Sequence, residues 1–244
     1  MASTSETGHA VNYNNFNTLI TRCTGYLGRY NPTNTSLKVS NLQTVYTNAG
    51  NALQDIIHFK PAWDNAINQR QQLFFDMEKL TTRVINSFDS TEAVTDAQVK
   101  DAKAVVRKIR GERKSKKIIN PGPDDPNQIS ASQQSFANQV LHFGTLAGLV
   151  VAEPTYNPNE AELKGPALFT FLDSLTAANE AVATAQQPYL DALTARNTVF
   201  YQAKTGLVDL ALEAKKYVKS VSSITLPEFR QISGLKFSRP RKKK

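Results

Sequence analysis

The sequence of 244 residues contains only one cysteine, Cys23. A single thiol excludes a disulfide within the chain and any zinc site built on two or more thiolates. Because Cys23 lies in an apolar stripe at helical spacing, we predict that it is a core residue and not a nucleophile.

Long apolar runs are also absent. The longest, from Leu146 to Ala152, has about seven residues and is interrupted by Gly148, whereas a membrane-spanning helix needs about 20. The N-terminal stretch MASTSETGHAVNYNN has neither the basic region nor the apolar core of a secretory signal. We therefore expect a protein without a membrane span, located in the cytoplasm.

Little in the sequence points to an enzyme. The three histidines, His9, His58 and His142, have no second ligand at a recognised metal-binding spacing, and there is no glycine-rich phosphate loop. A catalytic triad assembles only in the folded chain, so sequence spacing does not test for one. We expect a protein without catalytic activity, cofactor, metal site or small-molecule substrate.

The formal net charge is +8, and two short segments carry the whole excess. Segment 107–117 (RKIRGERKSKK) has a net charge of +6 and segment 239–244 (RPRKKK) has +5, which leaves −3 for the rest of the chain. Such clusters bind nucleic-acid phosphates without sequence preference by releasing counterions. The alternative is that they are solvated, because cations complement the C-terminal end of a helix and lysine-rich tails aid solubility. The candidate phosphate-binding residues are Arg107, Lys108, Arg110, Arg113, Lys114, Lys116, Lys117, Arg239, Arg241, Lys242, Lys243 and Lys244.

The chain contains an internal duplication. Residues 30–85 and 156–211, paired at a constant shift of 126, share about 11 identities in 56 positions, where unrelated sequences would share about three or four. The phrase Tyr-Asn-Pro, followed by Leu-Lys, begins both copies at Tyr30 and Tyr156. We interpret this phrase as the corner between the first helix of each half and the next one, with Asn-Pro ending the first helix.

Both halves have the periodicity of helices. Apolar residues recur every seven positions from Leu42 to Val84 and from Leu168 to Leu210, which predicts a coiled-coil-like helix of roughly 50 residues in each half. Pro61 and Pro188 lie near the middle of these helices. A proline kinks or breaks a helix, and the unbroken heptad register favours a kinked, continuous helix over a hairpin.

A shorter helix precedes each long helix, and another closes each half. The closing segments, Thr95–Gly111 and Thr225–Gly234, begin with Thr followed three residues later by Gln or Glu, and both end in glycine. We predict an all-α, elongated helical bundle of two tandem pseudo-repeats. The predicted segments are a flexible N-terminus 1–12, repeat 1 at 13–119, a Pro-rich linker at 120–128, repeat 2 at 129–237 and a basic tail at 238–244.

Arg70 and Arg196 occupy the same heptad position in the two copies. A buried guanidinium must be paired and hydrogen-bonded, or its burial is costly. We expect either a register-setting ion pair or an arginine whose charged end reaches the solvent. The alternative is an anion or partner site repeated by the pseudo-symmetry.

Several strings in the sequence carry a family resemblance: YNP followed by LK, RKI.G.R.SKK, NQISASQ.SF, ARN...Y...TGLVD and YVKSV. Through these strings the protein resembles a family of uncharacterised all-helical bacterial proteins with an internal duplication, and the resemblance covers most of the chain. None of the strings is a catalytic signature. The resemblance implies an all-α fold and no particular activity.

These observations favour a non-enzymatic structural or protein-interaction protein, which binds a protein partner or associates with itself. The alternative is a nucleoid- or RNA-associated protein that binds nucleic acid or another polyanion through its two basic segments. Binding to duplex DNA and RNA at increasing salt concentration discriminates between them, because phosphate binding weakens steeply with salt.

Overall fold

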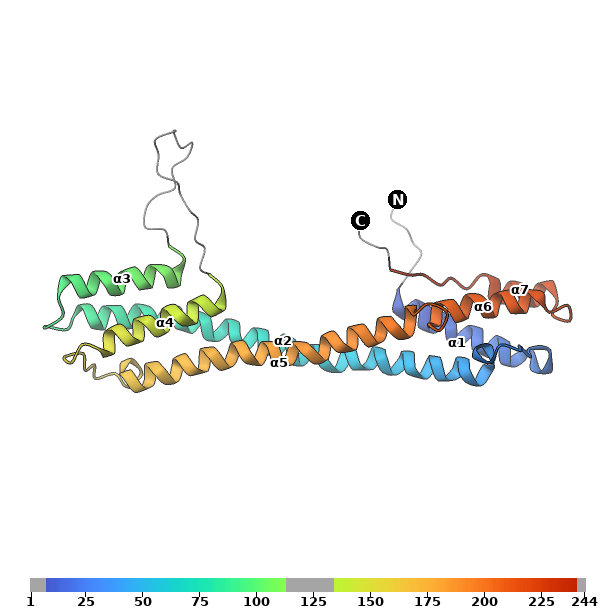
Figure 1. Cartoon of the computed structure of the whole chain (residues 1–244), viewed down its shortest axis with the longest axis horizontal. Coiled ribbons are helices and arrows are strands. Elements are labelled where there is room, and N and C mark those ends of the chain that lie inside the picture. Colours follow the sequence, from blue (N-terminus) through green and yellow to red (C-terminus); the bar gives the residue numbers. More distant parts are fainter. Residues whose placement is uncertain (1–7, 113–133, 241–244) are drawn as a thin grey trace, which may run out of the picture. The chain divides into compact units, whose positions relative to one another are not determined.

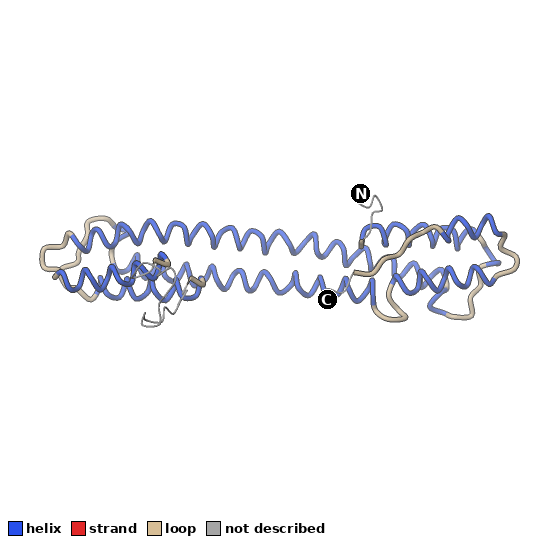
Figure 2. Tube along the Cα trace, turned by 90° about the horizontal axis from the view of Figure 1, so that it is seen from above, coloured by secondary structure: helices blue, strands red, loops and turns tan. Residues whose placement is uncertain are grey.

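The computed structural model describes residues 8–112 and 134–240. Every regular element in these two ranges is a helix, so the predicted all-α class is confirmed (Figures 1 and 2). The α-helices are α1 His9–Gly25, α2 Val39–Asp89, α3 Asp96–Arg110, α4 Phe136–Val151, α5 Gly165–Tyr201, α6 Leu207–Ser220 and α7 Leu226–Ser233. Three short 3-10 helices are η1 Leu27–Arg29, η2 Thr35–Leu37 and η3 Ala161–Leu163.

The chain forms two compact units that do not coincide with the two sequence repeats. Unit 1 consists of Met1–Pro61 and Gln186–Lys244, and unit 2 consists of Ala62–Ala185. Helices α2 and α5 contribute to both units, because the boundaries lie after Pro61 and after Ala185. Each unit therefore combines the first helix of one sequence half with the closing helix of the other half.

Each unit has its own hydrophobic core. In unit 1, Phe16 and Leu19 of α1 pack in one cluster with Leu207 and Leu210 of α6. In unit 2, Ile109 of α3 lies in a second cluster with side chains of α2, α4 and α5, and α3 lies against α4 (Figure 1). The buried residues of the heptad pattern thus share their cores with helices from both sequence halves.

Helix α2 is continuous over 51 residues with Pro61 inside it, as the heptad register favoured. Pro61 and Pro188 are both exposed, so water can satisfy the carbonyl groups that lose their helical donors. The prediction for the second copy is wrong in length, because α5 ends at Tyr201 after 37 residues. The turn that follows α5 has Lys204 at φ 69° and needs glycine at 206, where a Cβ atom would lie 2.6 Å from the backbone nitrogen of Gln202. The paired position in the first copy is Leu80.

The closing helices begin and end at the predicted threonines and glycines. Thr95 and Gln98 form a capping box at the start of α3, and Gly111 ends this helix in the left-handed conformation at φ 69°. At the start of α7, the Glu228 carboxylate accepts hydrogen bonds from the backbone nitrogen and hydroxyl of Thr225. Gly234 follows α7 in the right-handed conformation, which any residue can adopt, so the backbone does not require glycine there.

The repeated Tyr-Asn-Pro phrase lies between the first helix and the long helix in both halves, as interpreted. Asn-Pro does not end the first helix, however, because α1 already ends at Gly25 and α4 at Val151. Instead, the tyrosine closes the connecting loop on itself. The Tyr30 hydroxyl donates to the Leu37 carbonyl at 2.7 Å, and the Tyr156 hydroxyl donates to the Leu163 carbonyl at 3.1 Å.

Tyr30→Phe should lower the free energy of unfolding by about 1–3 kcal/mol, because it leaves the buried Leu37 carbonyl without its donor. Tyr156→Phe should cost less, because its hydrogen bond is longer and less buried. Urea unfolding of the two variants and the unaltered protein measures both effects. Equal stability of all three proteins would show that the tyrosines do not close these loops.

Candidate functional site

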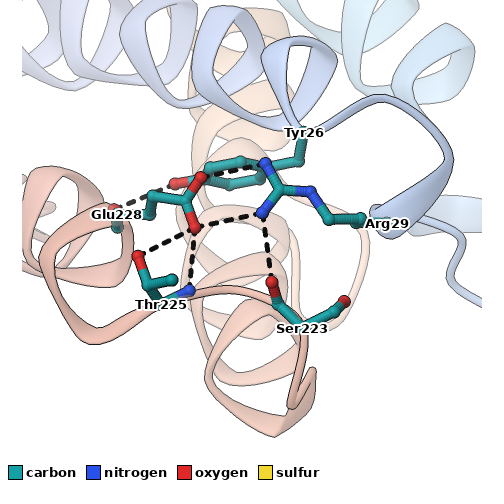
Figure 3. Close-up of polar contacts among 5 residues, drawn as sticks. All are labelled: Tyr26, Arg29, Ser223, Thr225 and Glu228. Atoms are coloured by element: carbon teal, nitrogen blue, oxygen red, sulfur yellow. Dashed lines mark hydrogen bonds and ion pairs between the residues drawn. The ribbon is translucent and has the colours of Figure 1, made fainter.

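The first candidate site lies in unit 1, where the segment after α1 meets the start of α7 (Figure 3). We call it the Leu27–Leu226 surface. Arg29 donates to both carboxylate oxygens of Glu228, at 2.9 and 3.1 Å, and also to the Ser223 carbonyl at 3.1 Å. The Tyr26 hydroxyl donates to the Glu228 carbonyl at 3.0 Å. These bonds join two segments that are about 200 residues apart in the sequence.

The Glu228 carboxylate is held in its charged form. Hydrogen bonds from Arg29, and then from the backbone and hydroxyl of Thr225, lower its pKa to about 2. The same contact with Glu228 raises the pKa of Arg29. The pair is partly solvated, because the Arg29 side chain is 40% exposed, and so it acts mainly to orient the two segments.

Two large apolar side chains project from the segments that this ion pair joins. Leu27 is 79% exposed and Leu226 is 61% exposed. Leu27 also has a φ of 52°, a left-handed conformation that is costly for a residue with a Cβ atom. The position paired with it in the second half, Glu153, has no positive φ, although α1 and α4 end at paired residues. The strain at Leu27 is therefore not a requirement of the repeated loop.

The second candidate site is the C-terminal end of α3 in unit 2, which carries three of the predicted phosphate-binding residues. Arg107 is half-buried, whereas Lys108 and Arg110 are exposed. Arg110 donates to the Thr82 hydroxyl of α2 at 2.8 Å, and its guanidinium lies 3.9 Å from the Glu112 carboxylate. The structure therefore brings these three cations to one helix end.

A shallow groove lies beside this helix end. It has a volume of about 310 Å³ and is lined by Phe75, Glu78, Lys79, Thr82 and Arg110. The Lys79 ammonium lies 4.2 Å from the centre of the Phe75 ring. Phe75 itself is 55% exposed. The groove thus combines an aromatic face, a hydroxyl and two cations with one carboxylate.

Of the remaining predicted phosphate-binding residues, only Arg239 is described, and it has partners within unit 1. Its guanidinium bonds the Asp209 carboxylate at 2.6 Å and the Tyr201 carbonyl at 2.9 Å. The hydrogen bond from Arg239 is the main reason that the pKa of Asp209 is lowered. The others lie outside the described residues: Arg113, Lys114, Lys116, Lys117, Arg241, Lys242, Lys243 and Lys244.

The two ends of the predicted domain scheme are partly ordered. His9–Asn12 belong to α1, although the predicted flexible N-terminus extends to residue 12. The fully buried Asn12 side chain exchanges two hydrogen bonds with the backbone of Ser238, at 2.8 and 3.0 Å. The predicted tail 238–244 therefore begins as an ordered segment against α1. The linker 120–128 and residues 113–119 of repeat 1 lie outside the described ranges.

For Arg70 and Arg196 we expected either an ion pair or a charged end that reaches the solvent; both side chains are half-buried, and their described contacts are not ion pairs. The Arg70 guanidinium lies 4.0 Å from the centre of the Phe136 ring, and its Nε atom is buried without a described hydrogen-bond partner. Arg196 donates from Nε and Nη2 to the Asn197 side chain. An aromatic ring satisfies part of a guanidinium charge, which explains why a carboxylate is not required at Arg70.

Cys23 is buried, as predicted, and burial raises the pKa of its thiol to about 11. Desolvation also lowers the pKa of His9 and of His142. Among residues 8–112 and 134–240, no group of three or more His, Cys, Asp or Glu side chains is placed to hold a metal ion. No helix in the same ranges is long and apolar enough to cross a membrane.

Sequence reasoning missed the two most informative side chains. Leu27 follows the apolar stripe of α1 by spacing, but it lies beyond the end of that helix at Gly25 and points into solvent. Phe75 follows Phe74 directly, and only Phe74 faces the core. A helix places adjacent residues on different faces, so the Phe-Phe pair itself was a usable signal for one exposed aromatic ring.

Comparisons of this chain with protein-family models, with curated proteins and with solved structures found no match.

The Glu228–Arg29 pair predicts a pH dependence of stability. Because the pKa of Glu228 is about 2 when folded and 4.5 ordinarily, its contribution should be complete above about pH 5 and should disappear as the pH falls towards 2. Thermal unfolding of the protein and of Glu228→Gln should give a difference in Tm at pH 7 that becomes smaller as the pH is lowered to 2.

Glu180→Gln, at an exposed glutamate of α5, is the control variant for this titration. A difference in Tm between the protein and Glu228→Gln that stays constant from pH 7 to pH 2 would contradict the assignment.

Proposed function

We propose that the protein is a non-enzymatic interaction protein that binds a partner protein through the Leu27–Leu226 surface. The observation that carries this proposal is Leu27, which is both strained and 79% exposed. The backbone strain at Leu27 is not offset by burial of its side chain, because that side chain is exposed to solvent. Strained residues of this kind are concentrated at binding and catalytic sites, where the strain serves the function.

The chemistry of this surface favours one kind of occupant. Two projecting leucines bury far less area than the 1,200 Å² or so of a stable interface, so a self-complementary contact between two copies of this surface would be weak. A partner that encloses a projecting leucine in an apolar pocket gains more from that side chain. The Arg29–Glu228 pair beside them supplies a polar rim.

Leu27→Gly separates the proposed binding role from stability. Glycine relieves the left-handed strain, which costs about 1–2 kcal/mol for a residue with a side chain, and adds about 0.5–1 kcal/mol of unfolded-state entropy. We expect the free energy of unfolding to stay the same or to rise by up to about 1 kcal/mol, as measured by urea unfolding. Binding of the partner should nevertheless be lost.

Photo-crosslinking tests the binding itself. A photoreactive leucine analogue at position 27 should form a discrete crosslinked product with one partner protein in the native cell, and Leu226→Ser should abolish it. The same analogue at Leu212, which is 41% exposed on α6, is the matched control. Equal products from positions 27 and 212, or a product that contains only a second copy of this chain, would contradict the proposal.

Nucleic-acid binding is the second candidate function, and the cations gathered at the end of α3 favour it. Arg107, Lys108 and Arg110 lie together on the last turn of this helix. Lys79 of α2 lines the groove beside them with Arg110. Four cations around one end of unit 2 supply the electrostatic attraction on which nonspecific binding depends.

Filter binding to duplex DNA and to RNA over a salt series tests this second function. We expect a Kd of about 10⁻⁴ to 10⁻⁶ M near physiological salt, with a steep decrease in affinity as salt rises. Replacing the cations of segment 107–117 by glutamine should weaken binding and flatten the salt dependence. No binding at low salt, or unchanged binding by this variant, would exclude nucleic-acid binding as the function.

A further inference from the structure

The groove beside α3 has an exposed aromatic ring, that of Phe75, in addition to its cations. The paired aromatic residue in the other half of the sequence is Tyr201, which lies in unit 1 and is half-buried. There, the His9 ring packs against the Tyr201 ring with centroids 5.4 Å apart, and Arg239 bonds the Tyr201 carbonyl. The chain thus packs its own His9 ring against this aromatic position in unit 1, and Arg239 bonds the backbone beside it.

In unit 2 the same position is open to solvent. Phe75 keeps 55% of its surface exposed, and the Lys79 ammonium lies 4.2 Å from the centre of its ring. Arg110 and Thr82 line the groove together with Phe75, while Glu78 is its one acidic side chain. An aromatic ring flanked by cations and a hydroxyl matches a ligand that presents a flat ring and negative charge together.

We propose that this groove binds single-stranded nucleic acid, with a base stacked on Phe75 and the neighbouring phosphates on Lys79 and Arg110. The inference rests on the second function proposed above and adds the class of nucleic acid and the residue that selects it. Stacking on aromatic side chains combined with cations along the backbone is the usual way in which proteins bind single strands. A duplex keeps its bases stacked on one another, so it cannot use Phe75 in this way.

Lys79 covers one face of the Phe75 ring in the free protein, and this contact is easily exchanged. The Lys79 side chain is 62% exposed, and its ammonium lies 3.5 Å from the Asp76 carboxylate. Because the exposed Lys79–Asp76 ion pair contributes little, the ammonium is easily displaced. A phosphate beside the groove attracts it away from the ring. The ring face that Lys79 leaves is then free for a base.

Arg110 is held in place for the same role. Its hydrogen bond to Thr82 of α2 fixes the guanidinium at the groove, and its contact with Glu112 is long at 3.9 Å. A guanidinium binds phosphate oxygens in pairs, which lysine does not.

The test uses the full-length protein and fluorescence anisotropy at about 50 mM salt, where nonspecific phosphate binding is strong. The probes are labelled oligo(U) and oligo(dT) of about 16 nucleotides, the span of one single-strand site, and a duplex DNA of the same length. Phe75→Ala should weaken binding to both single strands by about tenfold or more and leave duplex binding unchanged. Phe169→Ala, at a 40% exposed phenylalanine of α5, is the matched control and should change neither.

Phe75→Trp supplies a second readout that does not depend on loss of affinity. It should bind single strands at least as tightly as the unaltered protein, and oligo(U) should quench the fluorescence of the new indole by stacking on it. Arg110→Gln should weaken binding of all three nucleic acids, because it removes a phosphate contact. Unlabelled polyglutamate should compete only weakly with oligo(U).

Two failures are distinguishable. If Phe75→Ala binds single strands as well as the unaltered protein, while neutralisation of segment 107–117 abolishes binding, the groove assignment is wrong and the nucleic-acid function stands. If the unaltered protein binds none of the three nucleic acids at about 50 mM salt, the function itself is wrong, and the groove assignment is wrong with it. Competition by polyglutamate as strong as that by oligo(U) would also overturn the assignment, because an acidic peptide would then satisfy the groove.

Discussion

The apolar faces of α2 and α5 are covered by short helices from both sequence halves, and the rest of the fold depends on this shared covering. Each long helix has one part in each compact unit. In unit 1, the beginning of α2 shares a core with α1 and with α6 of the opposite half, and in unit 2 its end shares a core with α3 and α4. Burial of apolar surface is the dominant favourable contribution to folding, so neither half buries its stripe alone.

Polar side chains also join the two sequence halves in both units. In unit 1, Arg29 after the first helix bonds Glu228 at the start of a closing helix. In unit 2, Glu153 after the first helix accepts a hydrogen bond from Gln98, which holds the matching capping position of α3. The two candidate sites lie where the units differ from this common plan. Leu27 is strained where Glu153 is not, and Phe75 is exposed where Tyr201 is covered.

Periodicity and local signals predicted the helices well, because they depend on neighbouring residues. The long first helix, the buried Cys23 and the threonine starts of both closing helices are of this kind. The internal duplication remains a prediction from the sequence. The composition of the compact units was not predictable in this way, because a helix with an apolar stripe does not specify which other helix covers it. The early end of α5 was missed because the close approach of Gly206 to Gln202 exists only in the folded turn. The heptad pattern does not show it.

The sites were predicted less well than the fold. Charge patterning found Arg107, Lys108 and Arg110, because a cluster of cations is visible in the sequence. It also selected Arg239, whose bonds to Asp209 and Tyr201 come from segments 30 or more residues away. The exposure of Leu27 and Phe75 depends on where helices end and which faces are covered, and both are tertiary properties.

The central claim is that each compact unit is built from both halves of the sequence, and contacts between aromatic rings test it most directly. The Tyr30 and Tyr217 rings lie 5.3 Å apart in unit 1, and the Phe74 and Phe136 rings lie 4.7 Å apart in unit 2. An NMR spectrum of the protein with labelled aromatic residues should show nuclear Overhauser effects for both pairs. If contacts are seen between rings of one half, such as Phe143 and Phe171 at 5.5 Å, while both of these pairs give none, the halves fold separately and the account is wrong.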